Sequence, residues 1–190
     1  MMKKHLVLLS VLLFVTVIAS GQNYKKYYRA GTEFMKMGKY QDAVAQFTKA
    51  IEVEPSDADL YIARGKAYER TGDIKAAYSD FEKASGFSPR NVETLVKLGI
   101  ISNSMGNYNQ ALGYLNRATK IEKRNNIIYP EKIAALMGLE DYEKALDASD
   151  TALVLKEEPR IFYYRGIAFA NLKDDVQAKK ELERALSKDS

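Results

Sequence analysis

The chain has 190 residues, with 29 Lys and Arg, 25 Asp and Glu, one His and no Cys. This length is sufficient for one domain with a substantial core. The lack of Cys excludes disulfides, thiolate nucleophiles and Cys-based metal sites. The four Pro and 11 Gly are too few for a collagen-like or linker-like chain.

The first 21 residues have the order of a secretory signal peptide. Lys3 and Lys4 form a basic start, residues 6–18 are almost entirely apolar, and small residues follow at 19–21. This order predicts export with cleavage after Gly21. The alternative is an uncleaved membrane anchor, but the apolar run of about 13 to 15 residues is shorter than the roughly 20 that span a bilayer.

Cleavage would change the chemistry available to the mature chain. It would remove Lys3, Lys4 and His5, leaving 27 basic residues against 25 acidic ones and neither His nor Cys. A nearly neutral chain without a basic stripe is not expected to bind nucleic acid. His-dependent general bases and His- or Cys-based metal sites are also excluded. An exported chain with no disulfide and no Asn-x-Ser/Thr glycosylation site indicates a bacterial envelope.

The remainder of the chain repeats with a period of 34 residues, shortened once to 33 near Pro159. A period of this length is typical of helical repeat proteins. Small and aromatic residues recur at fixed phases: Gly31, Gly65 and Gly99; Gly38, Gly72 and Gly106; Tyr27, Tyr61, Leu95, Tyr129 and Phe162; Ala43, Ala77, Ala111, Ala145 and Ala178. The predicted domain at 22–190 therefore contains five repeats, at residues 24–57, 58–91, 92–125, 126–158 and 159–190.

Each repeat is predicted to be a pair of helices. In the first, apolar residues spaced i, i+4 and i+7 mark one face of each helix, and Gly38 marks the turn between them. A glycine inside a helix costs about 1 kcal/mol relative to alanine, so the recurrent glycine at positions such as Gly31 requires a packing reason. We expect the first helix of each pair (helix A) to approach an alanine of the second (helix B) closely at that point.

These phases resemble the tetratricopeptide repeat (TPR) family. The resemblance rests on the period, the small-residue phases, the aromatic residue near the start of each repeat, and the closing Pro55 and Pro89, and it covers residues 24–190. It implies an all-α fold, a right-handed α-solenoid of five stacked antiparallel helix pairs. A 35-residue RNA-binding helical repeat is the nearest alternative, and the period and balanced charge count against it.

The fourth repeat departs from the pattern. Ile133 stands at the helix-A glycine position, Ser149 stands at the helix-B aromatic position, and Pro130 falls where helix A should already be running. Because proline is tolerated in the first turn of a helix, we expect this helix A to begin late, near Tyr129.

No motif indicates catalysis. The chain has no Gly-rich phosphate-binding loop and no calcium-binding loop, and its acidic clusters, such as Asp174 with Asp175, fall at predicted turns or outer helix faces. A hydrolase using paired carboxylates would also need a pocket and a shifted pKa. We therefore expect a non-enzyme with no catalytic residue, no cofactor and no metal site.

The resemblance also implies a binding surface, because A helices line the concave groove with which such solenoids bind partners. Carried over by phase, the groove positions follow the residue at the helix-A aromatic phase by one, five or eight residues. The candidate residues are Tyr28, Ile62, Lys66, Val96, Ile100, Asn103, Met137, Tyr163 and Ile167. Those of the later repeats are mostly apolar, which suits an adaptable contact with another protein.

The sequence thus predicts a protein–protein interaction scaffold or adapter of the bacterial envelope, periplasmic or secreted, that binds a protein or peptide segment in its groove. The alternative is a structural envelope component that self-associates through its last repeat, where Val176, Leu182 and Leu186 would form an apolar end. That alternative would make the protein a homo-oligomer. Neither reading includes stable membrane insertion after signal cleavage.

Overall fold

The computed structural model describes residues 24–188, and the regular structure in this range is entirely helical. The prediction of an all-α fold is therefore confirmed. The predicted signal segment and its cleavage point lie outside the described residues. The helices are residues 24–36, α2 (Tyr40–Val53), α3 (Ala58–Thr71), α4 (Ile74–Phe87), α5 (Val92–Ser104), α6 (Tyr108–Ile121), α7 (Ile128–Gly138), α8 (Tyr142–Leu155), α9 (Pro159–Asn171) and α10 (Asp175–Lys188).

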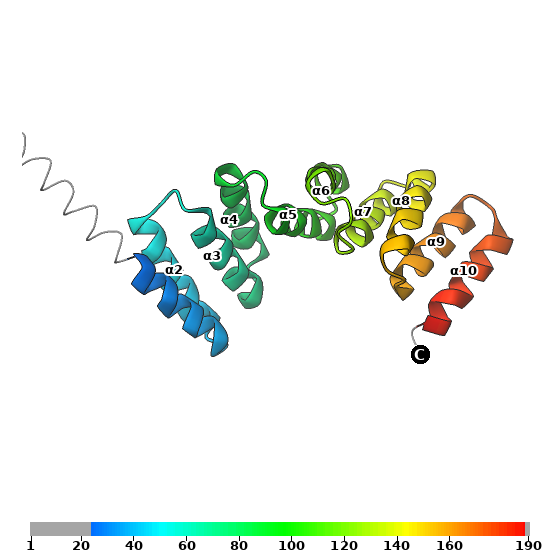
Figure 1. Cartoon of the computed structure of the whole chain (residues 1–190). Coiled ribbons are helices and arrows are strands. Elements are labelled where there is room, and N and C mark those ends of the chain that lie inside the picture. Colours follow the sequence, from blue (N-terminus) through cyan, green and yellow to red (C-terminus); the bar gives the residue numbers. More distant parts are fainter. Residues whose placement is uncertain (1–23, 189–190) are drawn as a thin grey trace, which may run out of the picture. The chain divides into compact units, whose positions relative to one another are not determined.

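The helices fall into two compact parts, one ending at Pro89 and the other beginning at Arg90. In the N-terminal part, α3 packs against both α2 and α4. In the C-terminal part, the pairs are α5 with α6, α7 with α8, and α9 with α10 (Figure 1). Helix α7 also packs against α5 and α9. The A helices of the C-terminal part therefore form a contiguous layer.

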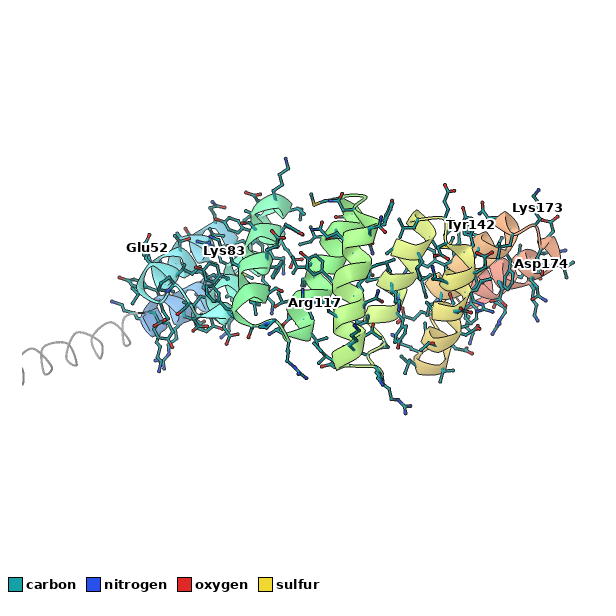
Figure 2. The ribbon with its side chains drawn as sticks, turned by 90° about the horizontal axis from the view of Figure 1, so that it is seen from above. Glu52, Lys83, Arg117, Tyr142, Lys173 and Asp174 are labelled. Carbon is teal, nitrogen blue, oxygen red and sulfur yellow. The ribbon has the colours of Figure 1, made fainter. Side chains whose placement is uncertain are left out.

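The turn within each pair contains one residue with a left-handed backbone. Gly38, Gly72 and Gly106 have φ angles of 72°, 84° and 74°. The corresponding residues of the last two pairs are Glu140 and Lys173, with φ angles of 58° and 63°. Figure 2 shows Lys173 beside Asp174 at the exposed turn before α10. Glycine suits this conformation because it has no Cβ, so the last two turns carry strain that the first three avoid.

The helical glycines do mark close approaches between helices A and B, but their neighbours are large side chains. A Cβ placed on Gly31 would lie 2.6 Å from Cε1 of Phe47, and one on Gly99 would lie 2.6 Å from Cγ of Leu115. At Gly166 the nearest atom is Cγ of Leu182, again 2.6 Å away. The expected alanine side chain is therefore not the nearest partner. The glycine makes room for the bulky helix-B residue 16 positions later, and of the recurring alanines Ala178 contributes its backbone oxygen, 3.2 Å from a Cβ placed on Gly166.

The fourth pair reverses this arrangement of sizes. Ile133 replaces the glycine and is fully buried, while Ser149 replaces the large helix-B residue and is also buried. The Ser149 hydroxyl donates to the carbonyl of Ala145 at 2.6 Å, so its polar atom is satisfied within α8. Helix α7 begins at Ile128 with Pro130 in its first turn, which confirms the predicted late start.

The tyrosines near the start of two helices A connect successive pairs. The hydroxyl of Tyr61 donates to the carbonyl of Pro55 at 2.8 Å, and the hydroxyl of Tyr129 donates to the carbonyl of Lys123 at 2.9 Å. Both rings are buried. Buried phenols usually find a hydrogen-bond partner, and here the partner is the loop that leads into the helix. These tyrosines are therefore structural.

Within residues 24–188, each helix is too short or too polar to cross a bilayer.

Candidate functional site

The candidate groove residues all lie on A helices, but two of them are largely buried. Ile62 of α3 is 7% exposed and Val96 of α5 is 8% exposed. Val96 belongs to a core cluster that includes Leu95, Leu115 and Ile128. The expectation of exposed side chains at these two positions is corrected, whereas Tyr28 and Tyr163, at the same phase of the repeat, are exposed.

Val96 and Ile100 nevertheless line a pocket of 470 Å³ in the C-terminal part, which we call the α5 pocket. Its apolar wall is completed by Val92 and by Ile127, which is 59% exposed. Polar side chains, including Glu93 of α5, surround it. Ile127 comes from the loop before α7, and the repeat pattern did not identify it because the phases describe helices and leave the connecting loops unassigned.

Asn103 and Met137 occupy neighbouring helices of the same layer. The Asn103 side-chain amide donates to the carbonyl of Glu131 at 2.8 Å and so links α5 to α7. Its own Oδ1 is buried and has no hydrogen-bond partner in the protein. Met137 packs, half-buried, against the core cluster of α7 and α8. Asn103 therefore has a structural contact in addition to its predicted role.

Tyr163 lies apart from the α5 pocket. It is 51% exposed and lines a second apolar pocket, of 540 Å³, with Pro159, Leu182 and Leu186. We call this the α9–α10 pocket. Ile167, one turn further along α9, is half-buried. The structure thus places Tyr163 beside Leu182 and Leu186, two of the three apolar residues that are predicted to form the self-associating end.

The two candidates in the N-terminal part are more isolated. Tyr28 is exposed, and its ring lies 5.8 Å from the ring of Phe47, measured between centroids. Lys66 of α3 is half-buried. No described pocket brings either residue together with another candidate.

Several charged side chains at the surface form ion pairs, and two of these pairs shift the pKa values of the carboxyl groups involved. Within residues 24–188, no group of three or more His, Asp or Glu residues is placed to hold a metal ion. A hydrogen bond from Lys144 lowers the pKa of Asp141, and one from Lys188 lowers the pKa of Glu157. Burial raises the pKa of the Tyr164 phenol. None of these three groups lines the α5 pocket, which combines an apolar wall with polar groups at its edge.

Comparison with known proteins agrees with this architecture. A TPR repeat family model matches residues 31–72, and a tetratricopeptide repeat model matches residues 58–91 and 92–125, which are the predicted second and third repeats. No curated protein is significantly similar in sequence.

Several solved structures have the same fold. One described as MamA protein has a TM-score of 0.84 at 20% sequence identity, covering 88% of this chain and 92% of its own. MamA from Desulfovibrio magneticus RS-1 has a TM-score of 0.82 at 20% identity, covering 88% and 95%. MamA from AMB-1 has a TM-score of 0.77 at 22% identity, covering 87% and 91%. The solved structures show a shared fold, and the repeat models, which together match residues 31–125 or half of the chain, show that the chain belongs to the tetratricopeptide repeat family.

Proposed function

We propose that this protein is an interaction scaffold of the bacterial envelope, and that it binds an apolar segment of a partner protein at the α5 pocket. TPR proteins generally mediate protein–protein interactions, and repeat solenoids bind through the surfaces that their stacked helices create. The single observation that carries the proposal is the apolar wall formed by Val96, Ile100 and Ile127, which lies beside a polar edge.

The expected affinity follows from the area available. Apolar burial contributes about 25 cal/mol per Å², and the loss of motion on binding offsets much of it. A pocket of 470 Å³ accommodates a few side chains, so we expect micromolar binding. Because the wall is apolar, binding should depend only weakly on salt, unlike binding through charge clamps or to nucleic acid.

The test begins with crosslinking in the native envelope and identification of the partner by mass spectrometry, followed by calorimetry with the purified pair. Ile100→Asp should abolish measurable binding, since it places a charge in the apolar wall. Ile74→Asp is the matched control, because Ile74 begins α4 in the other compact part and is partly exposed. Circular dichroism must show that both variants are folded. Unchanged affinity in folded Ile100→Asp, or loss of binding between low and moderate salt, would contradict the proposal.

The export step is proposed from the N-terminal sequence alone. The basic start, the apolar run and Gly21 support secretion with cleavage before Gln22. N-terminal sequencing of the protein recovered from the cell envelope should begin at Gln22, or be blocked if Gln22 has cyclised. An intact chain that begins at Met1 and is released only by detergent would instead support an uncleaved anchor.

A second candidate function is self-association through the α9–α10 pocket. Tyr163 and Leu186 are 51% and 75% exposed there, and large apolar side chains grouped on a surface are typical of contact sites. Analytical ultracentrifugation of the wild type and of Leu186→Glu distinguishes the two functions. A concentration-dependent dimer that the substitution disrupts would favour self-association, whereas a monomer throughout would leave the α5 pocket as the binding surface.

A further inference from the structure

An arginine of the second helix pair bridges three helices. The Arg64 guanidinium donates from Nε and Nη2 to the two carboxylate oxygens of Asp80, at 2.7 and 2.8 Å, and from Nη1 to the hydroxyl of Thr48 at 3.1 Å. Arg64 belongs to α3, Asp80 to α4 and Thr48 to α2. The hydrogen bonds to Asp80 raise the pKa of Arg64. Helix A is thereby joined both to its own helix B and to the preceding one.

The fifth pair contains the same bridge. Arg165 of α9 stands at the phase of Arg64 and donates from Nε to Oε2 of Glu181 at 3.2 Å. Its Nη1 pairs with Asp150 of α8. Glu181 and Asp150 stand at the phases of Asp80 and Thr48, respectively. The second and fifth pairs therefore share an arginine on helix A that is paired with a carboxylate on the following helix B, whereas the first and third pairs have Ala30 and Leu98 at the arginine phase.

The fourth pair keeps the cation and lacks both acids. Lys132 of α7 stands at the arginine phase, Ala148 stands where Asp80 and Glu181 stand, and Asn116 stands where Asp150 stands. Lys132 forms no ion pair within residues 24–188. It is half-buried, and burial lowers its pKa. A cation that is partly removed from water without a partner gains more than an exposed one from an incoming negative charge.

A second side chain is also absent from the fourth pair. In the first, second and fifth pairs, a basic residue of helix B lies over the helix-A aromatic ring: Lys49 over Tyr27 at 6.0 Å, Lys83 over Tyr61 at 5.6 Å, and Arg184 over Phe162 at 4.2 Å. Figure 2 labels Lys83 on α4. In the fourth pair the corresponding residue is Thr151, opposite Tyr129. Thr151 and Ala148 are both small.

These replacements coincide with a pocket of 650 Å³, which we call the Lys132 pocket. It is lined by residues of α6, α7 and α8, including Asn116, Tyr129, Lys132, Ala148 and Thr151. It shares no lining residue with the α5 pocket, so a ligand here would be additional to the partner segment of the proposed function. Smaller side chains at two helix-B phases therefore leave space where the second and fifth pairs place polar groups.

We propose that the Lys132 pocket binds an aspartate or glutamate side chain of a partner protein, whose carboxylate takes the place that Asp80 and Glu181 occupy beside Arg64 and Arg165. The Asn116 side chain, an amide in place of an acid, can donate to such a carboxylate.

The remaining charges of the pocket are compatible with an incoming carboxylate. Lys144 is already paired with Asp141, Nζ to Oδ2, at 2.5 Å. Asp147 is the one lining acid outside that pair, and it lies on the exposed rim, where solvent and salt screen its charge. Lys132 is therefore the half-buried charge of the pocket that lacks a counter-charge.

The test uses two small probes that differ only in charge, N-acetylglutamate amide and its neutral isostere N-acetylglutamine amide. The lysines of the purified protein are labelled by reductive ¹³C-methylation and followed by NMR, with the Lys132 signal assigned by its loss in Lys132→Arg. N-acetylglutamate amide should shift the Lys132 signal saturably, and the isostere should not. The signal of the exposed Lys75 should respond equally and weakly to both probes.

Two variants restore an acid within the chain. Ala148→Asp supplies the missing helix-B carboxylate, and Asn116→Asp supplies the one that Asp150 provides to Arg165. Each should raise the dissociation constant of N-acetylglutamate amide at least about tenfold, because hydrogen bonds to charged groups are the strong ones. Gln110→Asp is the matched control: it adds the same charge to an exposed position of α6 outside the pocket lining and should change the constant less than about twofold.

If Ala148→Asp does not fold, Asn116→Asp decides the result, because Asn116 is exposed. Equal responses of Lys132 to the two probes, or unchanged affinity in folded Asn116→Asp, would overturn the proposal. A loss of affinity in Gln110→Asp equal to that in Asn116→Asp would overturn it as well, since binding would then reflect net charge alone.

Discussion

Gly65 of α3 and Phe81 of α4 fill one shared volume between their helices. A Cβ on Gly65 would lie 3.0 Å from Cε1 and 3.1 Å from Cζ of the Phe81 ring, closer than ordinary van der Waals contact. Phe81 is fully buried. The side chains at these two positions must therefore have a fixed combined size. In the fourth helix pair, Ile133 and Ser149 fill the corresponding space with the large side chain on helix A.

Gly65→Leu should destabilise the protein by about 1–3 kcal/mol, because the new side chain must displace a buried ring in a closely packed core. Thermal or urea denaturation followed by circular dichroism measures the change. Gly86→Ala is the control: a Cβ there meets no atom within 4 Å, and the substitution should be neutral or stabilising by up to about 1 kcal/mol. Unchanged stability of Gly65→Leu would show that Phe81 can move aside without cost.

A stricter test introduces into the second helix pair the two residue types that the fourth pair has at these positions, isoleucine on helix A and serine on helix B. Gly65→Ile alone should be strongly destabilising, whereas Gly65→Ile combined with Phe81→Ser should recover part of the loss, because the new side chain then enters space that the ring has left. If the double variant loses more free energy of unfolding than the two single variants lose together, the two side chains do not share one volume.

Removing only the carboxylate from the buried ion pair of Arg64 and Asp80 should lower the free energy of unfolding more than removing both charges. Asp80→Ala leaves the guanidinium without its carboxylate, and removal of one partner from a buried pair costs about 3–5 kcal/mol. The side chain of Arg64 is 15% exposed, so we expect a loss near the lower end of that range. The double variant Arg64→Met/Asp80→Leu should be more stable than Asp80→Ala, since no buried charge remains. Equal stabilities, measured by urea denaturation, would argue against a desolvated arginine.

The left-handed turns predict a stabilising substitution. Lys173 is exposed and has a φ angle of 63°, so Lys173→Gly should increase stability by about 0.5–1 kcal/mol through release of backbone strain. Gly72→Ala should have the opposite effect, because it introduces a Cβ at a φ angle of 84°. Scanning calorimetry of the two variants should show melting temperatures displaced in opposite directions, and a shared direction would refute the explanation.

Lys132 predicts a pH-dependent effect on stability. Burial lowers its pKa from the ordinary value of 10.5, so the folded state binds this proton less tightly than the unfolded state. The destabilisation of the folded state by charged Lys132 is therefore fully present below the pKa of Lys132 in the folded state, and it disappears as the pH rises past its pKa in the unfolded chain. Lys132→Met keeps the aliphatic stem and should raise the free energy of unfolding at pH 7 by up to about 1 kcal/mol.

The advantage of Lys132→Met should shrink as the pH approaches 10.5. Urea denaturation at a series of pH values measures the difference between wild type and variant. A difference that stays constant, or grows with pH, would show that Lys132 is not held in an unfavourable charged state.

The sequence determined the repeat itself. Periodicity is local information: residues spaced by i, i+4 and i+7 share a helix face whatever surrounds them, and Gly38, Gly72 and Gly106 mark turns because their backbone conformation suits glycine. The late start of α7, which begins at Ile128 with Pro130 in its first turn, follows from the same local rules. The family and the all-α architecture were therefore accessible without coordinates.

Tertiary structure decided which of the recurring positions remain open. Phase placed Ile62, Val96 and Tyr163 on equivalent positions, yet the first two are buried and the third is half exposed, because exposure depends on the neighbours that cover each position. The α5 pocket required Ile127 from a loop that follows no period. The Lys132 pocket is lined by side chains from three helices, and the small residues Ala148 and Thr151 leave it open. The sequence of any one of these helices does not predict the pocket. The packing around each side chain depends on residues from segments far apart in the chain, and the repeat pattern of one segment does not specify those neighbours.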